Sequence, residues 1–219
     1  MNTKSNATTI LCYGDSNTWG QKPDKTGRYL AEIRWTGVLQ QSLGDDYYVI
    51  EEGLSSRTTD LEYSRKLGRN GKTYLTPCIG SHNPLDIVIL MLGTNDLKIE
   101  FNRSASQIAL ATAGLIEDIK NTAWDKAKDV PQIIVVSPIL IDSHTPDFSN
   151  FYSENYNEES ARKSEQLANE VKKITIDMDC HFIDAASVSS AGSDGIHFNE
   201  ASHLALGKLL ANYIQRLKV

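Results

Sequence analysis

The continuous apolar run Ile87-Val88-Ile89-Leu90 constrains the fold more than any other segment of the chain. A strand with one face in water alternates apolar and polar residues, whereas an uninterrupted apolar run is typical of a strand that is covered on both faces. Four further runs with strand character are spread along the sequence. We therefore predict strands over residues 9–13, 48–52, 87–92, 133–137 and 181–184.

Helical periodicity fills the intervals between the predicted strands. Apolar residues three or four positions apart predict helices over residues 108–119, 167–178 and 206–217, and a further helix over 34–43 is expected to end before Gly44. This alternation predicts a parallel sheet of about five strands in an α/β sandwich with helices on both faces. A chain of 219 residues can bury one substantial core, so the simplest organisation is a single domain over residues 1–219.

Two segments break the alternation. Residues 21–33 contain Pro23 and Gly27, and residues 138–157 contain four Phe and Tyr residues. Loops of this length in a compact domain are usually functional or disordered. The aromatic residues favour a pocket wall or an oligomer contact, and the alternative is a compact loop that its own rings pin to the scaffold.

Charge and composition disfavour several kinds of partner. The net charge is −6 and no basic run occurs, which disfavours nucleic acid and anionic membrane surfaces. No apolar stretch approaches the roughly 20 residues that span a bilayer, and the first residues show no secretory signal pattern. Cys12, Cys78 and Cys180 fit neither a disulfide framework nor a zinc motif. We therefore expect a cytoplasmic protein with no metal and no other cofactor.

A candidate nucleophile, Ser16, follows the first predicted strand in the sequence Gly14-Asp15-Ser16-Asn17. The glycine predicts a tight turn that places the serine at the carboxyl end of the sheet, where open α/β folds bind ligands. A serine hydroxyl becomes an effective nucleophile when a base takes its proton. The alternative is that Ser16 only caps a helix.

His197 is the best candidate for this base because Asp194 precedes it by three residues. The spacing brings both side chains to one turn, where the carboxylate can orient the imidazole toward Ser16. The alternative is a local turn made by Asp194 beside a packed core histidine. The other histidines lack an acidic partner at this spacing and are interpreted as structural or surface residues: His82, His144, His181 and His203.

Three hydrogen-bond donors are candidates for stabilising an oxyanion. They are the backbone N–H of Ser16, the backbone N–H of Gly53 at the end of a strand, and the side-chain amide of Asn95, which does not titrate. Taken singly, Gly53 and Asn95 are better explained as turn or capping residues, and the functional interpretation depends on their occurring together.

Longer blocks around these residues resemble the SGNH (GDSL-type) hydrolases, and within them the arylesterase/acyltransferase branch. The blocks span residues 10–20, 34–39, 49–59, 84–96 and 194–198. The resemblance implies a flavodoxin-like three-layer α/β/α sandwich, with Ser16 as the nucleophile, His197 as the base and Asp194 as the acid that orients it. Ser16, Gly53 and Asn95 are then expected to form the oxyanion hole. The expected pocket lining is Trp19, Ile196, Phe148 and Phe151.

The same resemblance implies an esterase that hydrolyses small acyl esters, acetyl esters above all, through an acyl-serine intermediate. It also implies acyl transfer to alcohols or hydrogen peroxide and a homo-oligomer, up to an octamer. A carbohydrate O-acetylesterase with the same catalytic residues is the closest alternative. A lysophospholipase or thioesterase would need an extended apolar channel that no segment clearly supplies. A non-catalytic flavodoxin-like binding module is disfavoured because the nucleophile, base and acid are all present.

Overall fold

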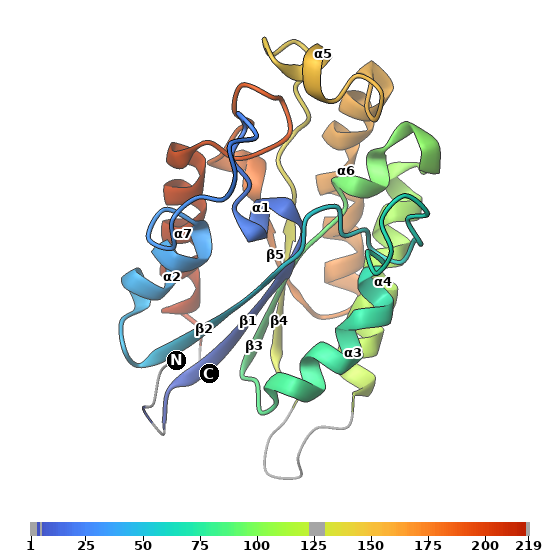
Figure 1. Cartoon of the computed structure of the whole chain (residues 1–219). Coiled ribbons are helices and arrows are strands. Elements are labelled where there is room, and N and C mark those ends of the chain that lie inside the picture. The colour runs from blue at the N-terminus through green and yellow to red at the C-terminus, as the bar shows by residue number, and fades with distance from the viewer. Residues whose placement is uncertain (1–3, 5, 123–129, 218–219) are drawn as a thin grey trace.

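The computed structural model of the chain describes residues 4, 6–122 and 130–217. Its centre is a parallel sheet in the order β2-β1-β3-β4-β5 (Figure 1). Each predicted strand is confirmed, with ends that differ from the prediction by at most one residue. The order is that of flavodoxin-like folds. The strands are β1 (Thr8–Gly14), β2 (Tyr47–Gly53), β3 (Ile87–Met91), β4 (Gln132–Ser137) and β5 (His181–Asp184).

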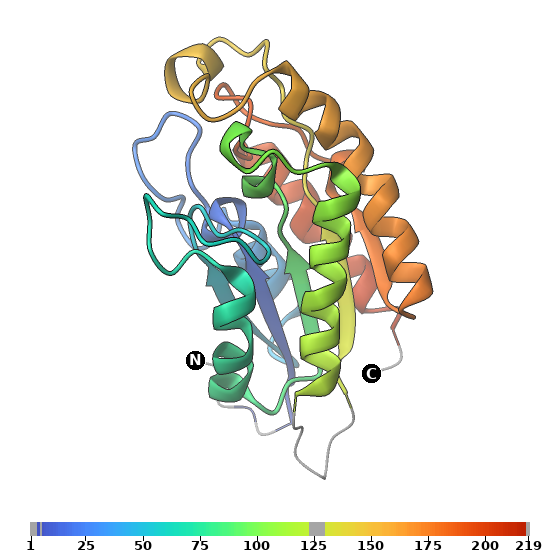
Figure 2. The same cartoon turned by 90° about the vertical axis from the view of Figure 1, so that its right-hand side faces the viewer.

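Helices cover both faces of the sheet, which confirms the three-layer sandwich. One face carries α2 (Trp35–Leu43) and α7 (Glu200–Ile214), as Figure 1 shows. The other face carries α3 (Gly71–His82), α4 (Ala105–Asn121) and α6 (Glu158–Asp177), which stand toward the viewer in Figure 2. None of the helices in the described part of the chain combines the length and apolar character that crossing a membrane requires.

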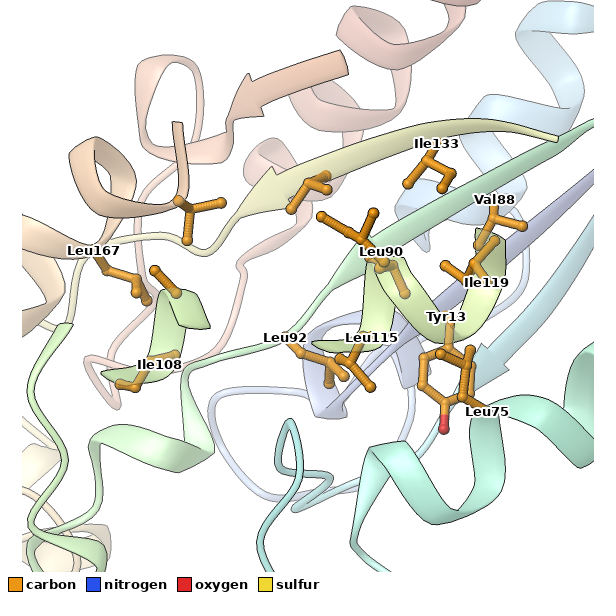
Figure 3. Close-up of a cluster of buried hydrophobic side chains, with 14 of the residues drawn as sticks. Tyr13, Leu75, Val88, Leu90, Leu92, Ile108, Leu115, Ile119, Ile133 and Leu167 are labelled. Atoms are coloured by element: carbon orange, nitrogen blue, oxygen red, sulfur yellow. The ribbon is translucent and has the colours of Figure 1, made fainter. Parts of the chain in front are cut away.

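Two apolar clusters, one on each face, hold the layers together. Successive residues of a strand point to opposite faces, so Ile89 of β3 belongs to the cluster under α2 and α7 whereas Leu90 belongs to the other. Figure 3 shows the second cluster, where Leu75 of α3, Leu115 of α4 and Leu167 of α6 pack with the strand residues. Burial of each such side chain stabilises the fold by roughly 1.5–3 kcal/mol.

The ends of several helices follow from their capping residues. The Ser104 hydroxyl accepts a hydrogen bond from the Gln107 N–H at 3.2 Å, and the Gln107 side chain accepts one from the Ser104 N–H at 2.9 Å, so a capping box starts α4. Gly44, with φ +75°, follows α2 as predicted. The helix predicted over 206–217 is displaced, since α7 runs from Glu200 to Ile214.

The sequence did not predict α3. Its apolar positions form no clear stripe, and Pro77 and Gly80 lie inside it. The helix nevertheless begins at a capped end, because the Asn70 side chain accepts a hydrogen bond from the Thr73 N–H at 3.2 Å. Its buried residues, Leu75 among them, then fill the core beside β2 and β1.

Two short elements stand at the carboxyl end of the sheet (Figure 1). The four-residue helix α1 (Ser16–Trp19) follows β1 directly. The helix α5 (Phe148–Phe151) interrupts the segment predicted as a loop over 138–157. Phe148 lies in the same buried cluster as Ile141 and Tyr156, so aromatic rings pin this segment to its scaffold.

Candidate active site

The turn after β1 presents Ser16 as the first residue of α1. The Asp15 side chain caps this helix by accepting a hydrogen bond from the Asn17 N–H at 2.9 Å, so the capping residue is Asp15 and not Ser16. A β-carbon on Gly14 would lie 2.1 Å from the Thr18 hydroxyl oxygen, so the turn has room for glycine alone. The Ser16 hydroxyl is therefore not used to start the helix.

Ser16, His197 and Asp194 form a buried chain of hydrogen bonds. The Nε2 atom of His197 lies 2.9 Å from Ser16 Oγ, and the Nδ1 atom lies 2.7 Å from Asp194 Oδ2. A carboxylate accepts only, so the imidazole proton belongs on Nδ1 and Nε2 is left to accept from the hydroxyl. The structure thus brings together the residues that the sequence predicted as nucleophile, base and orienting acid.

Asp194 is fixed by the turn that it forms. Its Oδ1 atom accepts hydrogen bonds from the N–H groups of Ile196 and His197, each at 2.9 Å, which leaves Oδ2 for the imidazole. Gly195 has φ +73°, and a β-carbon there would lie 2.0 Å from the Asp142 carbonyl oxygen. One carboxylate therefore makes the local turn and also contacts His197, which combines the two interpretations that the sequence left open.

Asn17 is a site residue that the sequence analysis missed. Its Oδ1 atom accepts a hydrogen bond from the Phe198 N–H at 2.9 Å, and its Nδ2 atom donates to the Ile196 carbonyl at 3.2 Å. These two partners flank His197. The amide therefore ties the helix of Ser16 to the loop of the histidine. The sequence offered one signal for this role, the position of Asn17 directly after Ser16. An amide buried there needs a hydrogen-bond donor for its oxygen and an acceptor for its nitrogen.

Gly53 pairs with Gly14 in the parallel register of β2 and β1. A β-carbon on Gly53 would lie 2.1 Å from the backbone nitrogen of Trp19. The short helix that carries Ser16 can therefore rest on the end of β2 only because this residue is glycine. Packing against Trp19 is therefore a sufficient reason for glycine at position 53, whether or not Gly53 takes part in catalysis. The same packing places Gly53 beside the Ser16 turn.

Asn95 begins the short 3-10 helix η1 (Asn95–Leu97), which follows β3. Its buried Nδ2 atom donates to the Arg57 carbonyl at 3.1 Å and to the Asp15 carboxylate at 3.3 Å. The amide therefore lies beside the Ser16 turn, and the contact with Asp15 is the longer and weaker of the two. Burial raises the pKa of Asp15, against the Asn17 N–H and the charge of His197, which lower it.

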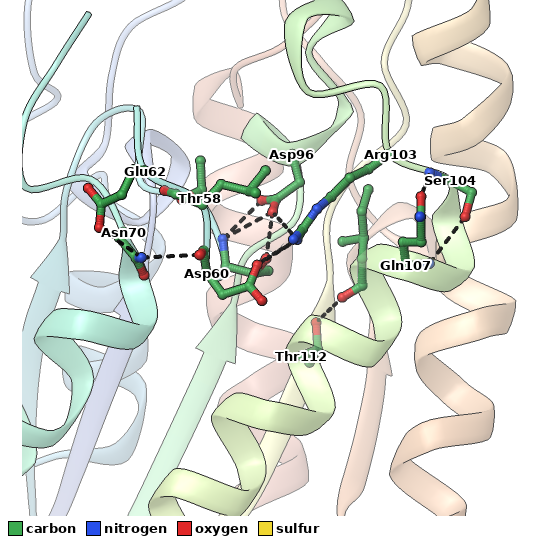
Figure 4. Close-up of polar contacts among 12 residues, drawn as sticks. Thr58, Asp60, Glu62, Asn70, Asp96, Arg103, Ser104, Gln107 and Thr112 are labelled. Atoms are coloured by element: carbon green, nitrogen blue, oxygen red, sulfur yellow. Dashed lines mark hydrogen bonds and ion pairs between the residues drawn. The ribbon is translucent and has the colours of Figure 1, made fainter. Parts of the chain in front are cut away.

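A buried polar network holds η1 in place (Figure 4). The Asp96 carboxylate accepts hydrogen bonds from the N–H of Thr59 at 3.0 Å and from its hydroxyl, and Arg103 Nη1 lies 3.3 Å away. Arg103 also pairs with Asp60 at 2.6 Å. Burial raises the pKa of Asp96 to about 6, although the Thr59 bonds and the Arg103 charge lower it. Spacing in the sequence does not reveal this network, because its members come from separate loops.

Arg57 fastens the carboxyl ends of β1 and β2 to one another. Its side chain is only 2% exposed, and Nη1 donates to the carbonyl groups of Gly14, at 2.9 Å, and of Glu52. The guanidinium carbon lies 4.0 Å from the centroid of the Tyr13 ring, a cation–π contact that favours burial of the charge. One side chain thereby holds β1 at Gly14 and β2 at Glu52, the residue before Gly53.

The four predicted pocket residues occupy different environments. Phe148 and Ile196 are buried in one apolar cluster, and Ile196 adjoins His197 in the chain. Trp19 is half-buried, with the Arg28 guanidinium carbon 5.3 Å from its ring centroid. Phe151 is half-buried and faces the Lys25 ammonium, which lies 4.3 Å from its ring centroid.

Three half-buried polar side chains, Gln21, Ser55 and Tyr152, form what we call the polar rim. The Tyr152 ring lies against the base, with its centroid 5.7 Å from that of the His197 ring. Its hydroxyl accepts a hydrogen bond from Gln21 Nε2 at 3.1 Å, and the Ser55 hydroxyl donates to Gln21 Oε1 at 3.4 Å. The backbone N–H of Gln21 donates to the Ser16 carbonyl at 2.9 Å, so the rim adjoins both ends of the Ser16–His197 pair.

Three of the other histidines have structural partners. One is His181, whose Nε2 and Nδ1 atoms lie 2.9 Å from Gln132 Oε1 and from the Tyr213 hydroxyl. His203 is buried, its Nδ1 atom accepts a hydrogen bond from the Trp35 N–H at 3.2 Å, and burial lowers its pKa to about 3. His82 pairs with Glu52 at 2.9 Å. Within residues 4, 6–122 and 130–217, one group of three side chains could hold a metal ion: Glu52, Cys78 and His82. It shares no residue with the Ser16 chain of hydrogen bonds.

Known proteins resemble this chain over nearly its whole length. A model of the GDSL-like lipase/acylhydrolase family matches residues 12–205. The inhibitor-bound aryl esterase of M. smegmatis is 39% identical with a TM-score of 0.90, covering 97% of this chain and 100% of that chain. The carbohydrate acetylesterase Est24 of Sinorhizobium meliloti is 36% identical with a TM-score of 0.90, covering 96% and 100%.

A curated relative is longer than this chain. An acetylxylan esterase of Xylanibacter ruminicola is 25% identical over 231 residues, which cover 97% of this chain and 44% of that protein. The chain thus spans less than half the length of that relative. The family model and the two structures cover most of the chain, and the two structures share its fold. The chain belongs to the GDSL-like lipase/acylhydrolase family.

Proposed function

We propose that the protein is a serine esterase that hydrolyses small acyl esters, acetyl esters above all, through an acyl-Ser16 intermediate. The observation that carries this proposal is the 2.9 Å contact between Ser16 Oγ and His197 Nε2, continued by the 2.7 Å contact with Asp194. His197 takes the hydroxyl proton as Ser16 attacks the ester carbonyl, and Asp194 stabilises the imidazolium. The imidazolium gives its proton to the leaving alkoxide. Water activated by His197 then releases the acid.

The oxyanion formed in each step needs hydrogen-bond donors. In this proposal the donors are the N–H groups of Ser16 and Gly53 and the Nδ2 amide of Asn95. The packing of Gly53 against the helix of Ser16 and the position of Asn95 beside Asp15 support the assignment. The Asn95–Asp15 contact of 3.3 Å is long enough to be exchanged for a shorter bond to the oxyanion.

The acyl group is proposed to lie against Trp19, Ile196, Phe148 and Phe151. The burial of Ile196 and Phe148 in one apolar cluster, with Ile196 directly before His197 in the chain, supports an apolar floor close to the reacting atoms. Transfer of the acyl group to an alcohol or hydrogen peroxide would use the same intermediate with another acceptor in place of water. The ratio of the two products, measured with an added alcohol, tests this part of the proposal.

A cytoplasmic homo-oligomer, up to an octamer, also belongs to the proposal. Leu30 and Leu67 are 64% and 82% exposed in loops after α1 and β2, and a subunit contact would remove such side chains from water. The three free cysteines suit a reducing compartment. Light scattering coupled to size-exclusion chromatography tests the assembly, and a monomer at micromolar concentration would contradict it.

Turnover of p-nitrophenyl acetate, butyrate and octanoate by wild-type protein and Ser16→Ala tests the leading proposal. We expect turnover that declines with acyl length and is lost in the variant. A preference for octanoate would contradict the small-acyl assignment. Turnover that survives in Ser16→Ala would contradict the nucleophile, and no turnover of any of the three esters would favour a sugar-specific deacetylase or a binding module.

The polar rim favours a second candidate, a carbohydrate O-acetylesterase. Gln21, Ser55 and Tyr152 offer an amide and two hydroxyl groups beside His197, which match the donors and acceptors of a sugar leaving group. We expect Tyr152→Phe and Gln21→Ala to lower kcat/KM for an acetylated xylo-oligosaccharide more than for phenyl acetate. Equal losses for the two substrates would leave the aryl or alkyl ester as the better assignment.

A further inference from the structure

We propose that Glu52, Cys78 and His82 form a binding site for a zinc ion, separate from the residues that carry the esterase chemistry. One ligand atom from each residue lies within 4.8 Å of the other two. His82 Nε2 and Glu52 Oε1 are 2.9 Å apart. This inference does not depend on the proposed esterase function, because it uses none of the residues assigned to it.

Two elements bring the three side chains together. Cys78 and His82 are four residues apart on α3, so they lie on one face of the helix. Glu52 is two residues after Ile50 on β2, so both side chains point to the same face of the sheet. Ile50 and Cys78 share the apolar cluster under α3, and this packing holds the carboxylate opposite the helix face.

The donor set and its spacing suit zinc. Thiolate sulfur, imidazole nitrogen and carboxylate oxygen are its usual protein ligands, at about 2.0–2.3 Å in tetrahedral geometry. Those lengths put neighbouring ligand atoms roughly 3.3–3.6 Å apart. The 2.9 Å pair of His82 and Glu52 therefore needs to open by only about 0.5 Å. Three protein ligands leave a fourth position for water.

Two of the three proposed ligands are partly exposed to solvent. The Glu52 and His82 side chains are 20% and 29% exposed, whereas Cys78 is fully buried. Glu52 also lines a cavity of about 580 Å³ together with Gly53, Arg57 and Tyr74. A hydrated ion can therefore approach the carboxylate and the imidazole first and then the thiol.

The charges balance when the ion binds. Zinc binds the thiolate form of cysteine, so the Cys78 thiol must lose its proton when the ion binds. Zinc takes the place of this proton, which leaves to solvent. Thiolate and carboxylate together then neutralise the two positive charges of the ion.

Zinc titration of the purified protein in competition with a chromophoric chelator tests the site. We expect one equivalent to bind and the thermal midpoint to rise, because the ion joins α3 to β2 and binds only the folded state. Cys78→Ser and His82→Gln should each weaken binding at least about tenfold. Cys180→Ser and His144→Gln are the matched controls, and both should bind as the wild type does.

Cobalt substitution identifies the thiol ligand directly. We expect a thiolate-to-Co²⁺ charge-transfer absorption in the wild-type protein and its loss in Cys78→Ser. If Cys78→Ser fails to fold, the His82→Gln variant, at a partly exposed position, still decides the question. Absence of stoichiometric zinc binding, or binding that His82→Gln leaves unchanged, would overturn the proposal.

Discussion

The contact between Ser16 Oγ and His197 Nε2, 2.9 Å long, can be removed by one substitution that leaves its surroundings in place. Ser16→Ala keeps the Asp15 cap and the Asn17 contacts, so we expect an unchanged fold and a loss of activity on the order of 10⁴–10⁶-fold. Turnover of p-nitrophenyl acetate and thermal melting are the measurements. Ser106→Ala, at an exposed position on α4, is the control. A variant rate near that of the wild type would refute the nucleophile assignment.

Asn95 is proposed to act on the transition state rather than on the bound ester. Asn95→Ala removes an amide that cannot titrate, so the expected loss is about 10²–10³-fold in kcat, with a much smaller change in KM. Steady-state kinetics at saturating and subsaturating ester separate the two parameters. Asn169→Ala, an exposed substitution on α6, is the control. A change confined to KM would instead make Asn95 a ground-state binding residue.

At the scale of single residues, the sequence predicted those whose position at an element boundary is visible in the chain. Ser16 follows a strand and His197 follows Asp194 at turn spacing, and the structure brings these residues together. Arg57 and Asp96 were not predicted. Arg57 bonds to carbonyl groups at the ends of β1 and β2, and Asp96 accepts from the Thr59 N–H. A local sequence pattern carries no information on which of these distant segments will meet.

Among the elements, the packing of α1 on β2 depends on Gly53, because a residue with a side chain there would collide with α1. Gly53→Ala would place a β-carbon 2.1 Å from the Trp19 nitrogen, so α1 and with it Ser16 must shift. A displacement of about 1 Å can cost on the order of 10²-fold in rate, and we expect kcat/KM to fall by about that factor. Gly80→Ala is the matched control, because its β-carbon meets nothing within 4 Å and should stabilise α3 by about 0.5–1 kcal/mol. Equal activity of both variants would contradict the packing argument.

A side chain of α7 accepts the hydrogen bond of the first backbone N–H of α2. The Trp35 N–H donates to His203 Nδ1 at 3.2 Å, and burial lowers the pKa of His203 from 6.5 to about 3. Between these two values the unfolded chain binds the proton and the folded chain does not. The stabilising contribution is therefore complete above about pH 6.5 and is lost as the pH falls toward 3.

Replacing His203 should make the free energy of unfolding less dependent on pH. For His203→Asn, we expect the drop in unfolding free energy between pH 7.5 and pH 4.5 to be smaller than in wild type by roughly 2–3 kcal/mol. Urea unfolding at the two pH values measures it, with the exposed His144→Asn as control. An unchanged difference between the two pH values would show that His203 titrates normally in the folded protein.

Helices and strands could be predicted where their buried residues recur at regular positions in the sequence. The strand over Ile87–Met91 is buried throughout, and the stripe that begins at Ile108 marks the inner face of α4. α3 escaped prediction because its buried residues are few and Pro77 and Gly80 interrupt them. Tertiary packing against the core cluster, rather than local preference, makes that segment helical.

At the scale of the molecule, the strand order explains why the site lies where it does. The chain leaves β1 in one direction to form β2 and then crosses back to form β3 on the other side of β1. Loops after β1 and β3 consequently diverge, and ligands bind at such a switch point. Ser16 and Asn95 follow those two strands. The alternation of elements predicted a parallel sheet, but the pairing of distant strands is set by contacts that no window of sequence contains.

Asn17 joins the N-terminal and C-terminal parts of the chain. Its hydrogen-bond partners, Ile196 and Phe198, lie on either side of His197 and about 180 residues away in the sequence. Asn17→Ala removes both hydrogen bonds while leaving Ser16, Asp194 and the sheet untouched. We expect kcat to fall by about 10–100-fold, because the imidazole is no longer held at the nucleophile, and the unfolding free energy to fall by only about 1–3 kcal/mol. Asn17→Asp can still accept from the Phe198 N–H but cannot donate to the Ile196 carbonyl, so its activity should lie between the two. Kinetics and urea unfolding of the three proteins decide the matter. If both variants kept full activity, the relative positions of Ser16, His197 and Asp194 would have to be set by the Asp194 turn alone.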